Sequence, residues 1–373
     1  MVQPGAVPST PTREPSLPRS VPAQSVALAA GLLAVAVGAG LGVRHLQLEG
    51  PSVVAVVGLL LVVAGLALAV VAGRRLWRSV RGFRRLWFVP GAVVSVLVMW
   101  SVLLAVMVAV VPATPLVQGA AESSGVAVRT VSLSTEDGVS LSAWWAPSSN
   151  GAAVVLAHGS GENRSATLPA AAVLARHGYG VLLLDARGHG ESAGRGMDLG
   201  WYGDADVAAA VAFLGTQRSV DPGRIAVLGL SMGGEEALGA AAASPGIRAV
   251  VAEGATSRTA EDKAAWLPDG AHGVVQRVLD QATYGLVDLL TPAAPPTPLR
   301  EAVVRASDTR ILLIAAGTSP DEQAAAEVLR SVAPDRVTVW TVPGATHTSS
   351  LRTAPAEWEE RVVGFLDRTL ATR

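Results

Sequence analysis

The sequence predicts an α/β domain with a mostly parallel sheet, preceded by three transmembrane helices. Half of the 373 residues are hydrophobic and only 16% are charged, and the apolar excess lies before about residue 112. After that point, short apolar runs typical of buried strands alternate with helical segments, as in a parallel sheet covered on both faces. A formal net charge of −1, and the lack of a basic patch interleaved with aromatics in the C-terminal two thirds, argue against a nucleic-acid partner. The chain has no cysteine, which excludes disulfides and thiolate metal sites.

The N-terminal part is divided into a polar tail and three apolar runs. Residues 1–25 are rich in proline, serine and threonine, which predicts a disordered tail. The runs at 26–43, 52–72 and 89–111 carry no charge. At about 1.5 Å per residue, each is long enough to cross most or all of a hydrocarbon core. A cleaved signal peptide is the alternative for the first run, but its apolar stretch is too long and two more spans follow.

The distribution of arginine predicts how these spans are oriented. The segment between the second and third spans, residues 74–87, carries six arginines and no acid, whereas the first loop carries only Arg44 against Glu49. Loops rich in arginine stay in the cytoplasm. We therefore expect an integral protein of the plasma membrane, with the lipid bilayer as its partner and everything after residue 111 on the extracytoplasmic side.

Residues 112–125 are a small-residue linker, and the predicted α/β domain occupies residues 126–373. A hairpin opens the domain, and strands then alternate with helices. The predicted strands are Val126–Leu133, Val139–Trp145, Ala152–Ala157, Gly180–Leu184, Ile225–Leu228, Ala249–Ala252, Arg310–Ala315 and Val337–Thr341; the predicted helices are Leu168–His177, Gly203–Leu214, the alanine-rich segment after Ser231, Asp321–Ser331 and Ala356–Leu370.

The segment that organises the domain is Gly229-Leu230-Ser231-Met232-Gly233. It joins a buried strand to an alanine-rich helix, which is the setting of a nucleophile elbow. Such a turn is tight and strained, so a Cβ at either glycine would collide with the neighbouring strand or helix. The N-terminus of the following helix would stabilise negative charge near the serine.

Four pieces of this domain, in order, resemble the α/β-hydrolase family, in particular its serine-aminopeptidase-like and dienelactone-hydrolase-like branch. They are His158-Gly-Ser-Gly-Glu-Asn-Arg164, Asp185-Ala-Arg-Gly-His-Gly-Glu-Ser192, the Ser231 elbow, and a late His347 after a strand. The resemblance implies an α/β-hydrolase fold over about residues 126–373 and does not extend to the membrane region.

The resemblance also implies a catalytic triad in the order nucleophile, acid, histidine. Ser231 is then the nucleophile and His347 the base that takes its proton. The family position of the acid follows the strand that ends near residue 315, where Asp321 is our choice. Glu322 is the alternative beside it, and Glu253 stands at the end of the preceding strand, where some relatives carry their acid. One of these carboxylates is needed to orient the imidazole.

The oxyanion hole requires two backbone N–H groups. The family position predicts that they belong to Met232, directly after the nucleophile, and to Ser160. We expect the charged loop 185–192 to be structural, because buried ion pairs commonly hold such loops. His158 and His189 should likewise shape the pocket.

An insertion at residues 254–308 stands where the family usually carries a lid. It contains an amphipathic stretch, Gly273–Leu290, and then several prolines. Three interpretations remain for this stretch: a lid that gates the pocket, a helix that packs on the core, and a face that lies on the membrane.

Taken together, these features predict a membrane-anchored serine hydrolase. It would cleave an ester, thioester or amide of a small-molecule or peptide substrate through an acyl-enzyme, with no metal and no organic cofactor. The alternative is an inactive hydrolase-fold binding module on a membrane anchor, which a misplaced acid would favour.

Overall fold

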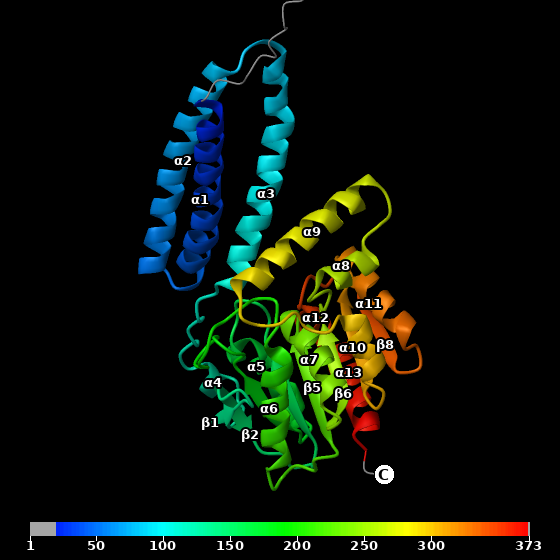
Figure 1. Ribbon diagram of the computed structural model, residues 1–373. Coiled ribbons are helices and arrows are strands. Elements are labelled where there is room, and N and C mark those ends of the chain that lie inside the picture. The colour runs from blue at the N-terminus through cyan, green and yellow to red at the C-terminus, as the bar shows by residue number, and fades with distance from the viewer. Residues whose placement is uncertain (1–19, 372–373) are drawn as a thin grey trace, which may run out of the picture.

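The computed structural model describes residues 20–371, with three long helices above an α/β domain (Figure 1). The predicted tail at 1–25 falls partly outside this range. Its last residues are not a tail, because the first helix already begins at Ser20. Small apolar residues such as Val21 and Ala23 are compatible with a helix that continues from the first span.

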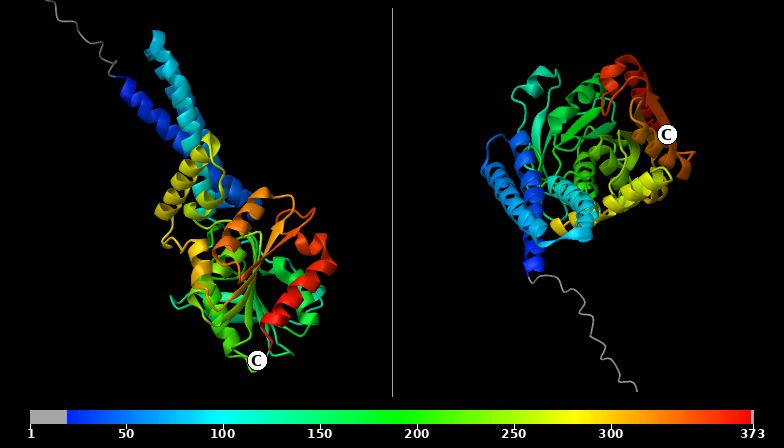
Figure 2. Two further views of the ribbon diagram at one scale, coloured as in Figure 1. Left: turned by 90° about the vertical axis from the view of Figure 1, so that its right-hand side faces the viewer. Right: turned by 90° about the horizontal axis from the view of Figure 1, so that it is seen from above.

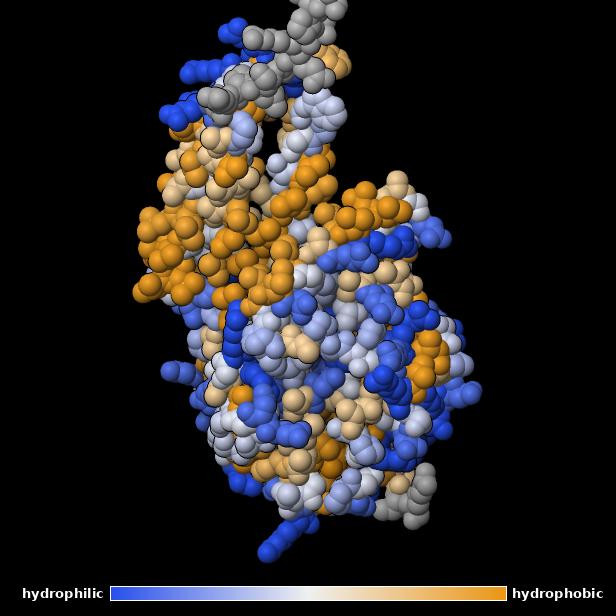
Figure 3. Space-filling model, viewed as in Figure 1, coloured by the Kyte–Doolittle hydropathy of each residue, from blue (hydrophilic) through white to orange (hydrophobic). Residues whose placement is uncertain are grey.

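Three helices of the described chain are long and apolar enough to span a membrane. They are α1 (Ser20–Leu48), α2 (Val53–Ser79) and α3 (Phe88–Ala109), and the 3₁₀ helix η1 (Gly82–Trp87) precedes α3. Helix α1 extends beyond its predicted apolar run at both ends, and α2 extends beyond its run at the C-terminal end, because their polar flanks remain helical. The arginine-rich segment lies at the end of the bundle far from the α/β domain (Figures 1 and 3).

Helices α1 and α2 approach each other through glycine. A Cβ on Gly58 would lie 2.4 Å from the backbone nitrogen of Gly42, and one on Gly65 would lie 2.7 Å from the carbonyl oxygen of Gly31. Small residues at such contacts let two backbones come close, which is a common way for membrane helices to pack.

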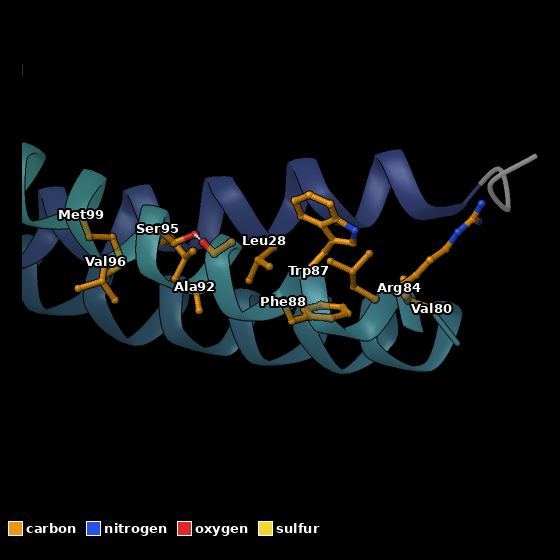
Figure 4. Close-up of a pocket in the computed structure, with 12 residues that line it drawn as sticks. Leu28, Val80, Arg84, Trp87, Phe88, Ala92, Ser95, Val96 and Met99 are labelled. Atoms are coloured by element: carbon orange, nitrogen blue, oxygen red, sulfur yellow. Dashed lines mark hydrogen bonds between the residues drawn. The ribbon is translucent and has the colours of Figure 1, made fainter. Parts of the chain in front are cut away.

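An apolar cavity of about 510 Å³ lies among the three helices near η1 (Figure 4). Arg84 and Ser95 are the polar residues of its lining, and Ser95 already donates its hydroxyl to Gly91. The lining has no histidine or carboxylate, so this cavity does not offer the groups of a hydrolytic site.

The α/β domain contains an eight-stranded sheet of order β1-β2-β4-β3-β5-β6-β7-β8. The first two strands are antiparallel to their neighbours and the remaining pairs are parallel. The strands are β1 (Arg129–Ser134), β2 (Ser140–Ala146), β3 (Ala153–Ala157), β4 (Gly180–Leu184), β5 (Ile225–Leu230), β6 (Ile247–Glu253), β7 (Arg310–Ala316) and β8 (Val337–Val342). Each matches a predicted strand with small shifts at its ends, so the predicted fold class is confirmed.

Helices cover both faces of this sheet, as the nearly continuous burial of β3 and β4 requires. One face packs against α5 (Leu168–Arg176) and α13 (Pro355–Thr369), and the other against α6 (Gly203–Gly215), α7 (Met232–Ala243), α10 (Leu299–Arg305) and α11 (Pro320–Val332). Shorter helices are α4 (Ala120–Ser123), η2 (Arg164–Thr167), α8 (Ala260–Trp266) and α12 (Ser350–Thr353); α9 (Ala271–Leu290) lies beside α3.

The predicted insertion at 254–308 therefore has two parts. Leu299 and Val303 of α10 are fully buried in the core of the sheet, so α10 is a core helix. Only α8 and α9 stand above the sheet, on the side of the spans (Figures 1 and 2).

The predicted linker at 112–125 packs against the domain. The Thr114 hydroxyl donates to the Gly161 carbonyl at 2.8 Å, and the Asn163 amide donates to the carbonyls of Thr114 and Pro115. These bonds tie the chain after the third span to the loop that follows β3.

Candidate active site

The elbow after β5 has the strained backbone that its sequence predicts. Ser231 has φ 52° and ψ −117°, a left-handed conformation that non-glycine residues rarely adopt. A Cβ on Gly229 would lie 2.1 Å from the Gly233 carbonyl oxygen, and one on Gly233 would lie 2.4 Å from the Ala157 carbonyl oxygen. Only glycine fits at both positions, so the motif holds Ser231 at the carboxyl end of the sheet.

The structure brings three predicted side chains into one hydrogen-bonded row. The Ser231 Oγ and the His347 Nε2 are 2.8 Å apart, and the His347 Nδ1 and the Glu322 Oε1 are also 2.8 Å apart. Since the carboxylate of Glu322 can only accept, Nδ1 carries a proton and Nε2 is free to accept one from the serine. This is the arrangement that activates a serine hydroxyl.

The carboxylate that contacts His347 is that of Glu322, which corrects our choice of Asp321. Helix α11 begins at Pro320, and successive residues of a helix point about 100° apart. Asp321 therefore faces solvent, whereas Glu322 is buried against the end of β7, where its Oε2 accepts the Ala316 N–H at 2.8 Å.

The other alternative, Glu253, has a different partner. It is buried at the end of β6 and accepts the N–H of Ser350 at 2.8 Å. Burial raises the pKa of Glu253. It thus fixes the start of α12, next to the loop that carries His347, and no hydrogen bond joins it to the imidazole within residues 20–371.

The charges of His347 and Glu322 suit a base that becomes protonated during reaction. The hydrogen bond that His347 donates to Glu322 raises the pKa of His347 above its usual value, against the opposing effect of burial. Burial by itself would raise the pKa of Glu322, but the hydrogen bonds from His347 and the Ala316 N–H outweigh it and lower that pKa. The carboxylate therefore stays ionised and stabilises the imidazolium.

Met232 and Ser160, the predicted oxyanion-hole residues, both lie beside the nucleophile. Met232 is the first residue of α7, and Ser160 lines the same pocket as Ser231. Their backbone N–H groups make no hydrogen bond to any residue between 20 and 371. By contrast, the N–H of Gly159 is taken by the Glu162 carboxylate at 3.0 Å.

A pocket of about 360 Å³ opens over these groups. Its lining comes from the loop after β3, the elbow and the loop after β8: Gly159, Ser160, Glu162, Ser231, His347 and Thr348. Thr348 has φ 52° and is, with Ser231, one of two non-glycine residues in the described chain with positive φ. Strained backbone at both is typical of a functional site.

Comparison with known proteins shows what this chain is similar to. The family described as serine aminopeptidase, S33, matches residues 148–309. An esterase of Pyrococcus furiosus superposes on 70% of this chain and 99% of its own with a TM-score of 0.55, at 24% sequence identity. The domain has the α/β-hydrolase fold. The S33 match includes Ser231 and ends before Glu322 and His347.

Sequence relatives of the α/β-hydrolase domain match it over shorter stretches. An uncharacterized protein of Mycobacterium tuberculosis is 38% identical over 120 residues, which are 31% of this chain and 42% of that protein. A thiohydrolase of Aspergillus aculeatus is 37% identical over 106 residues, 27% of this chain and 33% of its own. The chain thus spans less than half of the curated relatives it matches.

One contact beside the candidate site was not predicted from the sequence. Asp198, nearly fully buried, accepts the Gly161 N–H at 2.8 Å, lies 3.3 Å from the His189 Nε2, and forms an ion pair with Arg44 at the end of α1. Gly161 belongs to the loop that carries Ser160. The only sequence signal was that Arg44 stands alone in its loop, and nothing pointed to Asp198.

Burial raises the pKa of Asp198, but the hydrogen bond from His189 and the charge of Arg44 outweigh it, so the pKa is lowered overall. The membrane region therefore supplies a cation to the loop beside the nucleophile.

Other charged and histidine residues of the glycine-rich loops have structural contacts, as we expected. Arg164 and Asp185 form an ion pair at 2.7 Å with both side chains buried. His158 accepts the Ala186 N–H on Nε2 and lies 2.8 Å from the Gly159 carbonyl through Nδ1. Burial lowers the pKa of His158 to about 3, so it is a neutral structural residue.

Proposed function

We propose that this protein is a membrane-anchored serine hydrolase that cleaves an ester, thioester or amide through an acyl-enzyme. The observation that carries the proposal is the row Ser231–His347–Glu322 at an elbow of an α/β-hydrolase domain. The relatives with esterase, peptidase and thiohydrolase descriptions support the reaction class and leave the acyl group open.

The chemistry follows from the atoms of the row. The Ser231 Oγ attacks the acyl carbon while its proton passes to the His347 Nε2, and Glu322 stabilises the resulting imidazolium. The N–H groups of Met232 and Ser160 would donate to the oxyanion. The attack gives a tetrahedral intermediate. When it collapses, the bond to the leaving group breaks, and the leaving group takes the proton from His347. A water molecule then attacks the acyl carbon while its proton passes to His347. The bond from the acyl carbon to the Ser231 Oγ breaks, the acid is released, and His347 returns the proton to Oγ.

The inactive binding module loses its main support. That alternative depended on an acid out of reach of the imidazole, and the carboxylate of Glu322 lies 2.8 Å from it. The free N–H groups beside Ser231 also serve a reaction better than they serve simple binding.

A covalent probe tests the proposal. A fluorophosphonate should label the detergent-solubilised full chain on Ser231, and both Ser231→Ala and His347→Ala should abolish labelling. Asp321→Asn, which changes a neighbouring exposed carboxylate, should label like the unmodified chain. Absence of labelling in the native protein, or labelling that persists in Ser231→Ala, would contradict it.

We also propose that the hydrolase domain lies on the extracytoplasmic side of the plasma membrane. The arginines between α2 and α3 support this orientation, because they sit at the end of the bundle away from the domain. In the cysteine-free chain, a single thiol at Val304 should react with an impermeant maleimide on intact cells, and one at Phe83 should not; both side chains are exposed. The reverse labelling would mean the opposite orientation.

A further inference from the structure

Helix α9 carries an apolar stripe along its exposed face. The stripe consists of the residues Ala271, Val275, Val278, Ala282, Gly285 and Leu289, which recur every three or four positions and are all exposed. Residues at this spacing share one side of a helix. Val278 and Leu289 are 62% and 81% exposed. The stripe itself contains no charged or polar side chain.

The opposite face of α9 fixes how the helix is rotated. Asp280 is buried there and accepts from Lys263 at 3.2 Å and from Gln276 at 3.0 Å. Arg277 donates to the Leu267 carbonyl at 3.0 Å. These polar contacts point toward α8 and the loop after it, so the apolar stripe is held away from the hydrolase domain.

The C-terminal end of α9 is attached to the third candidate span. Val287 is fully buried in a cluster with Ala105 and Ala109 of α3 and with Met197 and Trp201 of the domain. From this attachment α9 rises obliquely away from α3, and its N-terminal half lies at the level of the lower part of α3 (Figures 1 and 2). Figure 3 shows its apolar residues beside the apolar band of the spans, with hydrophilic residues beneath them.

We propose that α9 lies in the outer leaflet of the bilayer, with its apolar stripe against the lipid acyl chains. If α3 spans a membrane, the stripe lies at the depth of the same leaflet because the two helices are packed together. A large aliphatic side chain gains roughly 1.5–3 kcal/mol when fully buried, so leaving this stripe in water would be unfavourable. An amphipathic helix with such a face commonly lies in the membrane interface.

The site opens on the same side of the domain, which bears on the substrate. Gly161, in the loop that lines the pocket, is in contact with Arg44 at the end of α1. Resting on the proposed function, we assign as substrate an acyl ester, thioester or amide carried by a membrane amphiphile, which reaches Ser231 from the leaflet rather than from the aqueous phase.

The position of α9 can be measured without any reaction. A Val278→Cys variant of the full chain carries one thiol, because the native chain has none, and can be labelled with the fluorophore NBD. In vesicles of phosphatidylcholine and phosphatidylglycerol, its emission should shift to the blue and be quenched by lipids with a nitroxide on the acyl chain. The matched control is Val304→Cys on α10, a valine 52% exposed outside the stripe, which should show neither effect.

An unshifted, unquenched probe at residue 278 would overturn the proposal. A shift that depends on protein concentration but not on lipid quenchers would also overturn it, since a second copy would then cover the stripe.

The substrate class is tested by two esters on the same vesicles. Val278→Asp should lower kcat/KM for a long-chain ester dispersed in the bilayer by about tenfold or more, because a carboxylate resists burial among acyl chains. It should leave hydrolysis of a short, soluble ester within about twofold, which also shows that the variant folds. Val304→Asp should change neither rate.

Equal loss on both esters, or a wild type that cleaves only the short one, would overturn the substrate assignment. If wild type cleaves neither, the proposed function fails, and the NBD result still decides where α9 lies.

Discussion

The membrane region and the hydrolase domain both place glycine where two backbones meet, but the consequences differ. Between α1 and α2, Gly58 and Gly65 set the distance between two helices. At the elbow, Gly229 and Gly233 set the direction of one hydroxyl. A replacement in the first region should therefore change how strongly the helices associate, whereas one in the second should change a reaction.

The two regions also differ in how they treat charge. The middle parts of the three spans contain no charged residue, while the domain buries ion pairs such as Arg164–Asp185. The regions meet at one such pair, Arg44–Asp198, beside the candidate site. The comparison thus predicts that most changes in the spans leave the chemistry unaffected, with Arg44 as the exception.

The largest expected effect lies entirely within the domain. Glu322→Gln should lower kcat by about 10³- to 10⁴-fold, because the amide neither stabilises the imidazolium nor fixes its tautomer. Asp321→Asn, one residue away, should stay within about threefold. Initial rates on a soluble ester measure both. A larger loss in Asp321→Asn than in Glu322→Gln would restore Asp321 as the acid.

The elbow glycine should have the next largest effect. A Cβ on Gly233 meets the Ala157 carbonyl at 2.4 Å, so Gly233→Ala should displace the turn and lower kcat by about 10²-fold. Fluorophosphonate labelling should slow by a similar factor. An unchanged rate would mean that the turn tolerates a shift, and that the elbow glycine does not control the reaction as the comparison predicts.

In the membrane region, the same glycine-to-alanine change should act on stability. Gly58→Ala places a Cβ 2.4 Å from the Gly42 nitrogen and should destabilise the detergent-solubilised protein by about 1–3 kcal/mol, with kcat per folded molecule unchanged. Gly73 meets only the tip of Leu28 at 3.9 Å, so Gly73→Ala should stabilise the helix by up to about 1 kcal/mol. Thermal unfolding of both variants gives the comparison, and equal shifts would contradict it.

Arg44→Gln should show the coupling between the regions. Without the guanidinium, the buried Asp198 holds Gly161 less firmly, and the Ser160 N–H is less well placed for an oxyanion. We expect a loss in kcat of about 3- to 10-fold with little change in KM, which corresponds to about 1 kcal/mol. Arg81→Gln, at the other end of the bundle, is the control. A similar loss in both would assign the effect to the membrane region as a whole.

The smallest effect concerns pH. The rate requires neutral His347, whose pKa is raised by Glu322. Activity should therefore fall as the pH drops through a value above that of an ordinary histidine. Since Glu322→Gln removes the carboxylate that stabilises the imidazolium, the midpoint of its residual activity should move to lower pH. A midpoint that moves upward or stays fixed would show that Glu322 does not raise the pKa of His347.

The sequence was sufficient for features that depend on composition or on steric exclusion. The three spans follow from long apolar runs, and the elbow follows from two glycines that nothing else can replace. The strands of the sheet were recognisable because strands covered on both faces are apolar throughout.

The acid was not determined by the sequence, because its identity depends on where α11 begins. A start one residue earlier would put Asp321 in the position that Glu322 occupies, and helix boundaries are the least certain part of any sequence reading. The Arg44–Asp198 contact joins residues far apart in the chain, and no local pattern marks such a pair. The core position of α10 was missed for a similar reason, since a single apolar turn fits a lid equally well.

The backbone at Thr348 has a practical consequence. Threonine is branched at Cβ and is strained at its φ of 52°, as is Ser231. A laboratory selection for heat resistance alone would favour glycine at both positions, because glycine accepts a positive φ without steric strain. Screens for a more thermostable variant should therefore measure turnover as well as stability, because selection for stability alone will enrich inactive variants.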